Sequence, residues 1–145
     1  MLILAVMVLA GAYLLYKSLG GAMPDVSITD QVQKIAQAIA TAEGFYVSGS
    51  RPQRNNNPGD MTQDLIGKST GKDGAFVVYA NVDDGWSNLY AQIQKWLDGT
   101  SSHATATSTI TDISSFYTTN DQASWATNVA NALGVSIDTQ IGQVS

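Results

Sequence analysis

The amino-terminal part of the chain is an almost unbroken apolar stretch. No charged residue precedes Lys17, and residues 2–16 are apolar apart from one glycine and the hydroxyls of Tyr13 and Tyr16. As a helix rising about 1.5 Å per residue, residues 1–19 would span just under the roughly 30 Å of a bilayer core. Interfacial tyrosines and a flanking lysine are typical of membrane anchors. We therefore expect one N-terminal transmembrane helix over residues 1–19.

A cleaved signal peptide is the alternative interpretation of this stretch. Signal peptides usually begin with a basic region and end at a small-x-small cleavage site, and neither is clear here. An uncleaved anchor is therefore the interpretation that we prefer. Its orientation stays open, because a single lysine provides too little charge asymmetry to set it.

A linker and one small domain follow the apolar stretch. Residues 20–29, GGAMPDVSIT, carry Gly-Gly, a proline and small polar residues, a composition that predicts a short linker. Residues 30–145 are then enough for one small domain with a modest hydrophobic core.

Apolar positions with a helical period predict four amphipathic helices in this domain. They cover about 30–43, 85–98, 110–117 and 121–133. Their apolar stripes comprise Val32, Ile35, Ala36 and Ile39, then Trp86, Leu89, Tyr90, Ile93, Trp96 and Leu97, then Ile110, Ile113, Phe116 and Tyr117, and finally Trp125, Val129, Ala132 and Leu133. Asp30 is the expected N-cap of the first helix, and Gly44 is its expected stop.

The segment between the first two predicted helices, residues 45–82, is irregular and rich in Gly, Asn, Asp and Pro. Its best strand is residues 75–80, and residues 71–74, Gly-Lys-Asp-Gly, suit a hairpin turn before that strand. The predicted fold is therefore mainly α, with a small β-hairpin element inserted after the first helix of the domain.

Composition excludes several kinds of chemistry. Twelve acidic residues against seven basic ones give a net charge of −5, and the chain has one histidine, His103, and no cysteine. Disulfides, zinc–thiolate sites and a cysteine nucleophile are therefore excluded. A pI near 4.4 without a basic stripe argues against a nucleic-acid partner. We expect no metal and no cofactor, and we interpret His103 as part of a solvated Ser/Thr-rich loop.

The single glutamate, Glu43, lies on the apolar side of the first predicted helix. On a helical wheel it falls between Ile39 and Ala36, in the last turn, where the helix dipole is negative. Desolvation and the dipole would both raise the pKa of this carboxyl, as a general acid requires. The alternative is that the terminal turn frays, so that Glu43 reaches water and pairs with Arg51 or Arg54.

Three motifs in order along the chain carry a resemblance to a known family. Residues 43–45 read Glu-Gly-Phe and are followed, after a Gly-containing loop, by Arg-Asn-Asn-Asn-Pro-Gly at 54–59. Residues 84–86, Asp-Gly-Trp, open a predicted helix, and residues 128–139 contain a closing helix and its cap. Over about residues 33–141 the sequence resembles the lysozyme-like domains of phage virion proteins and lytic transglycosylases.

This resemblance implies a lysozyme-like α-rich fold that acts on peptidoglycan. By position, Glu43 matches the catalytic acid of the family, which protonates the glycosidic oxygen between the MurNAc and GlcNAc sugars. Asn55, Asn56 and Asn57 become candidate substrate-binding residues, although asparagines in turns often serve only local capping. Two aromatic residues, Tyr46 and Tyr117, are candidates for the lining of the substrate cleft.

The resemblance leaves the second half of the mechanism open. A hydrolase needs a second carboxylate, for which Asp60 is the first candidate, with Asp64 and Asp73 as alternatives. Family members often carry a neutral residue where Asp60 stands. A lytic transglycosylase needs only one acid/base, because the C6 hydroxyl of the substrate attacks and an anhydro sugar forms. With one glutamate in the chain, we favour the transglycosylase route.

Taken together, these features suggest a membrane-anchored enzyme that cleaves peptidoglycan and belongs to the virion of a membrane-containing phage. Its expected partners are glycan strands, the lipid bilayer through residues 1–19 and other virion proteins, with no nucleic acid. One alternative is a catalytically inactive lysozyme-like protein that serves a structural or glycan-binding role in the virion. Another is a bacterial enzyme that remodels the wall from the inner membrane, facing the periplasm.

Overall fold

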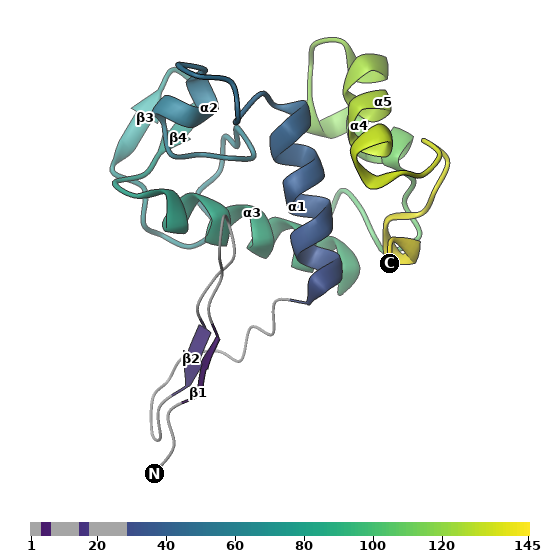
Figure 1. The fold of residues 1–145 in the computed structure, drawn as a ribbon, viewed down its shortest axis with the longest axis horizontal. Coiled ribbons are helices and arrows are strands. Elements are labelled where there is room, and N and C mark those ends of the chain that lie inside the picture. Colours follow the sequence, from purple (N-terminus) through teal and green to yellow (C-terminus); the bar gives the residue numbers. More distant parts are fainter. Residues whose placement is uncertain (1–3, 7–14, 18–28) are drawn as a thin grey trace.

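A computed structural model describes residues 4–6, 15–17 and 29–145, and this part of the chain is mainly helical (Figure 1). Its elements beyond residue 29 are α1 (Asp30–Ala42), α2 (Arg51–Arg54), β3 (Gly71–Asp73), β4 (Phe76–Val78), α3 (Val82–Leu97), α4 (Ile110–Tyr117), α5 (Gln122–Leu133) and the 3₁₀ turn η1 (Ile141–Gln143). The four predicted amphipathic helices are confirmed as α1, α3, α4 and α5. The four-residue helix α2 had no periodic signal in the sequence.

Side-chain caps fix where these helices begin. Thr29 rather than the predicted Asp30 is the N-cap of α1, because its side chain accepts a hydrogen bond from the Val32 N–H. Asn81 caps α3 in the same way, so this helix begins three residues before the predicted position. Thr109 forms a capping box at the start of α4. Each cap satisfies backbone N–H groups that have no partner within the helix.

The predicted β-element is a two-stranded antiparallel hairpin. Strands β3 and β4 pair with Gly71 opposite Val78 and Asp73 opposite Phe76. The predicted strand at 75–80 is therefore confirmed in a shorter form. The predicted turn is wrong by about three residues, because residues 71–73 form the first strand and Gly74, at a φ of 61°, begins the reversal.

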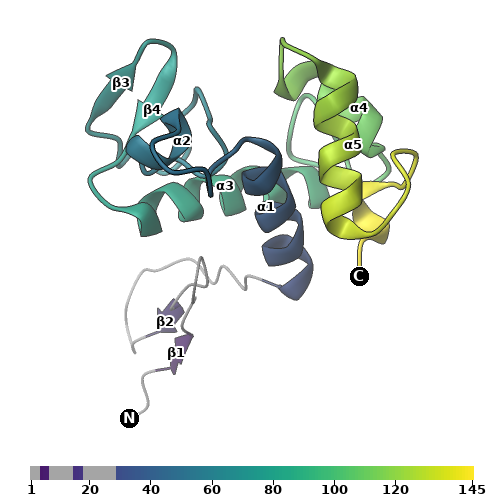
Figure 2. The same ribbon diagram turned by 45° about the horizontal axis from the view of Figure 1, so that its top comes forward.

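Helix α1 lies between two lobes (Figures 1 and 2). The hairpin and α2 form one lobe, α4 and α5 form the other, and α3 extends beneath both. Helix α1 contacts both α3 and α5, and α4 packs against α5. The carboxyl end of α1 is therefore held at the junction of the two lobes.

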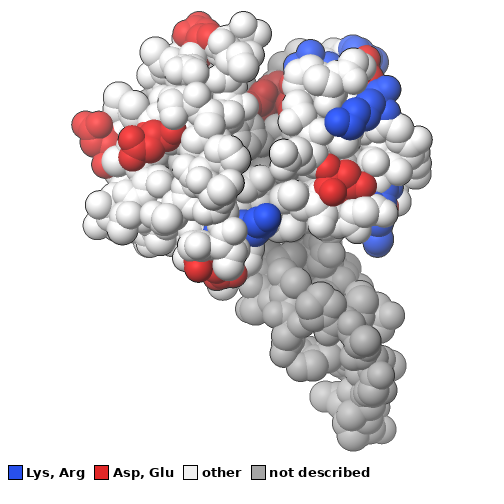
Figure 3. All heavy atoms as spheres, turned by 180° about the vertical axis from the view of Figure 1, so that it is seen from behind, with Lys and Arg blue, Asp and Glu red and all other residues white. Residues whose placement is uncertain are grey.

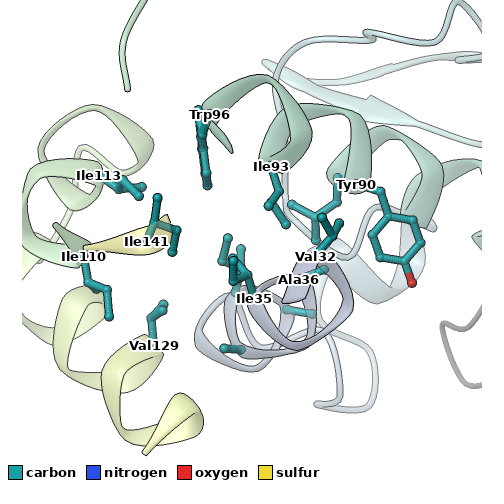
Figure 4. Close-up of a cluster of buried hydrophobic side chains, with 14 of the residues drawn as sticks. Val32, Ile35, Ala36, Tyr90, Ile93, Trp96, Ile110, Ile113, Val129 and Ile141 are labelled. Carbon is teal, nitrogen blue, oxygen red and sulfur yellow. The ribbon is translucent and has the colours of Figure 1, made fainter. Parts of the chain in front are cut away.

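A single apolar cluster joins these helices (Figure 4). Its fully buried members include Val32, Ile35 and Ile39 from α1, Leu89, Ile93 and Trp96 from α3, Ile110 and Ile113 from α4, Val129 from α5 and Ile141 from η1. Burial of a side chain of this size stabilises the fold by about 1.5–3 kcal/mol. Because α1 supplies apolar residues toward both α3 and α5, its position is fixed along its length.

The asparagine-rich segment holds the hairpin lobe together. Asn57 is fully buried, and its Nδ2 donates to the carbonyl oxygens of Met61 (2.9 Å) and Val77 (3.0 Å). Its Oδ1 accepts from the Met61 N–H at 3.0 Å. A side chain on Gly85 would place its Cβ 1.8 Å from the Asn56 carbonyl oxygen, so glycine allows α3 to approach this segment. The Gly-Trp start of α3 is thereby packed against the asparagine-rich turn.

The predicted membrane anchor lies almost wholly outside the described residues, as does the linker at 20–29 apart from Thr29. Within residues 1–19 the structure describes two short strands, β1 (Leu4–Val6) and β2 (Leu15–Lys17), which pair antiparallel. Among the described residues, no helix has both the length and the apolar character needed to span a bilayer. The transmembrane helix therefore stays a prediction from the sequence.

Replacing Asn57 by alanine tests the role of this buried amide. We expect Asn57→Ala to lower the free energy of unfolding by about 3 kcal/mol, because it leaves several buried backbone groups without partners. Chemical denaturation measures this change. Asn128→Ala, at an exposed position of α5, is the matched control and should stay within about 0.5 kcal/mol of the wild type. Equal stability of the two variants would contradict the assignment.

Candidate active site

A cleft of about 340 Å³ separates the two lobes. Arg51, Asp60 and Phe76 line it on the side of the hairpin lobe, and Tyr117 and the residues 118–120 line it on the side of α4. From behind, the surface is hollowed between the lobes, and most of this face carries neither acidic nor basic side chains (Figure 3). The cleft therefore presents a mixture of polar and aromatic side chains.

Glu43 is the C-cap of α1, at the junction of the lobes. Its backbone is helical, with φ −78° and ψ −5°, and its N–H donates to the Ile39 carbonyl at 2.9 Å. Its side chain is half-buried, and the Nε1 of Trp125 in α5 donates to its Oε1 at 2.7 Å. The predicted position on the apolar side of the helix is therefore confirmed. The alternative of a frayed end paired with an arginine is wrong.

The surroundings of Glu43 raise its pKa to about 7. Burial is the main cause, since it disfavours the charged carboxylate, and the nearby charge of Asp60 acts in the same direction. The hydrogen bond from Trp125 and the charge of Arg51 both lower the pKa and offset part of the effect. Near neutral pH this carboxyl can therefore donate a proton and take one back, as general acid–base chemistry requires.

Glu43 is not among the residues that line the cleft. Asp60 and Tyr117 do line the cleft, and both interact electrostatically with Glu43. The ring of Tyr117 also lies 5.0 Å from the ring of Trp125, the residue that donates to Glu43. The structure therefore brings three residues named from the sequence, Glu43, Asp60 and Tyr117, to one place.

Asp60 is held by Arg51. Its two carboxylate oxygens accept hydrogen bonds from the Nε (3.0 Å) and the Nη2 of Arg51, and its side chain is only 5% exposed. The guanidinium of Arg51 lies 3.4 Å from the centre of the Phe76 ring, in a cation–π contact. Asp60 itself has a left-handed φ of 46°, which is uncommon for a residue other than glycine. Its position suits the predicted second acid, but both of its oxygens already have a cationic partner.

The other two candidate acids lie elsewhere. Asp64 accepts hydrogen bonds from the backbone N–H groups of Ile66, Gly67 and Ser69 and from the hydroxyl of Tyr79. Burial would raise its pKa, but these hydrogen bonds prevail and lower it to about 2. Asp73 is half-exposed on β3. Neither aspartate is among the residues that line the cleft.

The three asparagines make hydrogen bonds within the framework of the hairpin lobe, and their role in sugar binding stays a prediction. Asn55 donates to Asp73 at 3.2 Å, Asn56 donates to the Tyr79 carbonyl at 3.0 Å, and Asn57 has no exposed surface. Their amide groups bond to neighbouring strands and loops because this segment forms few backbone hydrogen bonds of the kind that pair strands. Tyr46, the other predicted lining residue, is 57% exposed in the loop after Glu43 and is not part of the cleft wall.

Sequence reasoning missed three residues of the site. His103 was predicted to be solvated; it is exposed, but its ring contacts Phe116 (5.5 Å between centres) and lines the cleft. In the sequence, Arg51 was only a charged residue in a loop. Trp125 was only one position on the apolar stripe of its helix. Trp125 meets Glu43 across 82 positions of sequence, so no spacing rule could have joined them.

Comparisons of the chain with protein-family models, with curated proteins and with solved structures found no match. In the part of the chain that the structure describes, no group of three or more histidine and acidic side chains could hold a metal ion. The chemistry of the site thus rests on one carboxyl with a raised pKa beside a cleft that carries a neutralised Arg51–Asp60 pair.

The raised pKa of Glu43 predicts a specific dependence of stability on pH. The folded state binds this proton more tightly than the unfolded state, so stability should fall as the pH rises from about 4.5 to about 7. At about 1.4 kcal/mol per pKa unit, the loss amounts to about 3 kcal/mol. We expect Glu43→Gln to remove this loss and to be the more stable protein at pH 8, with little difference at pH 4.

Denaturation curves at several pH values measure this effect. Asp138→Asn removes the same charge from an exposed position and is the matched control. The curve of stability against pH for Asp138→Asn should run parallel to that of the wild type. A curve for Glu43→Gln that also runs parallel would mean that Glu43 has an ordinary pKa in the folded protein.

Proposed function

We propose that this protein is a peptidoglycan-cleaving enzyme, a lytic transglycosylase or muramidase of lysozyme-like fold, with Glu43 as its general acid/base. The observation that supports this most strongly is the half-buried Glu43, whose pKa is raised to about 7 and which interacts electrostatically with Asp60 and Tyr117 in the wall of the cleft. A carboxyl that holds its proton near neutral pH is the group that glycosidic bond cleavage needs. The resemblance of residues 43–59 to lysozyme-like domains supports the same assignment.

The cleft suits an uncharged glycan backbone. Its cationic and anionic side chains, Arg51 and Asp60, neutralise each other. The other lining residues are hydroxyl, amide and aromatic side chains, the one histidine and Met61. Hydroxyls and amides bond to sugar hydroxyls and N-acetyl groups, and aromatic rings pack on the apolar faces of sugars.

In the proposed reaction, Glu43 first acts as an acid. Its carboxyl proton passes to the glycosidic oxygen as the bond between C1 of MurNAc and that oxygen breaks, and positive charge develops at C1. The carboxylate that remains is stabilised by the N–H of Trp125, which donates at 2.7 Å. The same carboxylate then takes the proton of the attacking hydroxyl, which restores the acid for the next cycle.

The Arg51–Asp60 pair favours the transglycosylase route. A retaining or inverting hydrolase needs a second free carboxylate as nucleophile or base. Asp60 is the aspartate that lines the cleft, and hydrogen bonds from Arg51 engage both of its oxygens. Attack by the C6 hydroxyl of the same MurNAc on C1 needs no second carboxylate. We therefore propose 1,6-anhydro sugar ends as the product.

We further propose that residues 1–19 anchor the enzyme in a membrane, most simply the membrane of a phage virion, where it would open the wall locally during entry. The apolar sequence up to Lys17 supports this part of the proposal. A bacterial inner-membrane enzyme that faces the periplasm is the alternative location. Lipid co-sedimentation of the full chain, compared with a chain that lacks residues 1–19, distinguishes an anchored protein from an unanchored one.

Loss of the Glu43 carboxyl should abolish cleavage. We expect Glu43→Gln to lower the rate of peptidoglycan solubilisation at least about a hundredfold, because glutamine cannot donate the proton. A zymogram and a turbidity assay with the full chain measure this, with Asp138→Asn as the matched control. Mass spectrometry of the released fragments identifies anhydro or reducing ends. Equal clearing by the wild type and Glu43→Gln, or no clearing by the wild type, would sink the catalytic proposal.

The pH dependence of activity should report the pKa of Glu43. The acid must be protonated to act, so we expect kcat/KM to fall as the pH rises through about 7. Turnover of purified peptidoglycan between pH 5 and 9 measures the profile. Activity that is constant or rising above pH 7 would count against a protonated glutamate as the acid.

A further inference from the structure

Tyr117 connects the two lobes at the cleft. It is the last residue of α4, and its hydroxyl donates to the carbonyl oxygen of Gly59, in the hairpin lobe, at 2.7 Å. Burial raises the pKa of this phenol well above its usual value, so the hydroxyl keeps its proton and remains a donor throughout the working range of pH. The contact joins positions 58 residues apart.

The Gly59 end of this contact leaves no room for another residue. A Cβ on Gly59 would lie 2.7 Å from the Tyr117 hydroxyl oxygen and 2.9 Å from a methyl group of Leu89. Asp60, which follows directly in the chain, has the left-handed backbone and the Arg51 partner described above. The hydroxyl of Tyr117 is therefore fitted to the turn that carries Asp60 into the cleft.

The Tyr117 ring also supports the donor to Glu43. Its centre lies 5.0 Å from the centre of the Trp125 ring, at an interplanar angle of 30°, and 5.9 Å from the centre of the Trp96 ring, in an edge-to-face contact. Trp125 in turn donates to Glu43 at 2.7 Å. With Trp96 on one side and Gly59 at its hydroxyl, the tyrosine ring has little freedom to move, and neither has the indole packed on it.

We propose that Tyr117 is a positioning residue, whose hydroxyl bond to Gly59 fixes the ring that holds the Trp125 indole against the Glu43 carboxyl. This inference rests on the proposed function for its meaning in catalysis, but the linkage itself can be measured without activity. It differs from the sequence expectation, in which Tyr117 lines the cleft only as a surface for sugars. The hydroxyl that would face a ligand is instead directed to the protein backbone.

The linkage predicts an effect of Tyr117 on Glu43 with a definite sign. Charged and titratable groups facing Glu43 are Arg51 at the start of α2, Asp60 in the following turn and Tyr117 itself, while α5 contributes the neutral Trp125. The Trp125 hydrogen bond stabilises the carboxylate and so lowers the pKa. Removing the Tyr117 hydroxyl leaves the charges of Arg51 and Asp60 in place and loosens the indole, so the pKa of Glu43 should rise.

The sequence provides a direct probe, because Glu43 is the only glutamate in the chain. Glutamate labelled with ¹³C at its carboxyl carbon gives one side-chain resonance in the full-length protein in detergent micelles. Its titration reports the pKa of Glu43 without any substrate. We expect Tyr117→Phe to raise the midpoint by about half a pH unit and Trp125→Phe to raise it by about one.

A double variant separates positioning from simple destabilisation. If Tyr117 acts through the indole, Tyr117→Phe should add no further shift in a Trp125→Phe background, whereas independent effects would add. Tyr79→Phe is the matched control, because it removes a buried tyrosine hydroxyl that donates to Asp64 at 3.1 Å in the other lobe. We expect it to lower stability to a similar extent and to leave the titration of Glu43 unchanged.

The outcomes are distinct from those that test the proposed function. An unchanged or lowered midpoint in folded Tyr117→Phe, or additive shifts in the double variant, would overturn the positioning role even if the protein cleaves peptidoglycan. A raised midpoint with no wild-type activity would support the linkage and reject the enzyme. If the wild type is active, the midpoint of the alkaline limb of kcat/KM in Tyr117→Phe should shift in the same direction as the titration midpoint of the Glu43 resonance. In the same variant, kcat should fall several-fold more than KM rises.

Discussion

The site depends on the withdrawal of one carboxyl from water. Glu43 ends α1, where the carboxyl end of the helix disfavours negative charge, and helix packing leaves its side chain half-buried. One hydrogen bond from Trp125 partly compensates the charged form. The balance leaves the pKa near 7, so burial and the indole together set the proton affinity of the group. Without burial, the carboxyl would be too acidic to keep its proton near neutral pH. Without the Trp125 hydrogen bond, the carboxylate left after proton loss would be poorly stabilised.

Around this carboxyl the protein uses polar side chains as structural elements. Regular strands are short in the hairpin lobe, so buried amides bridge the backbone groups that strands would otherwise pair. Asn57 does this most completely, with three hydrogen bonds inside the lobe. The Arg51–Asp60 pair closes the lobe on the cleft side. A rigid lobe of this kind presents a fixed wall to a ligand.

Periodicity predicted most of the fold, because the amphipathic stripes of the long helices are local features of the sequence. It also placed Glu43 on an apolar side of its helix, which is the physical basis of the raised pKa. It could not assign the asparagines, since the same residue type serves sugars and backbone groups equally well. Nor could it find the Trp125 contact, because that contact exists only after α5 has packed on α1.

The same contact has a consequence for the life of the chain. Helix α1 is made early in synthesis, but the indole that completes the site is on the last long helix, α5. Until α5 docks, Glu43 is an ordinary solvated carboxyl that has lost its proton at neutral pH. A nascent or clipped chain without its carboxyl-terminal part therefore lacks the partner that gives this carboxyl its environment in the folded protein.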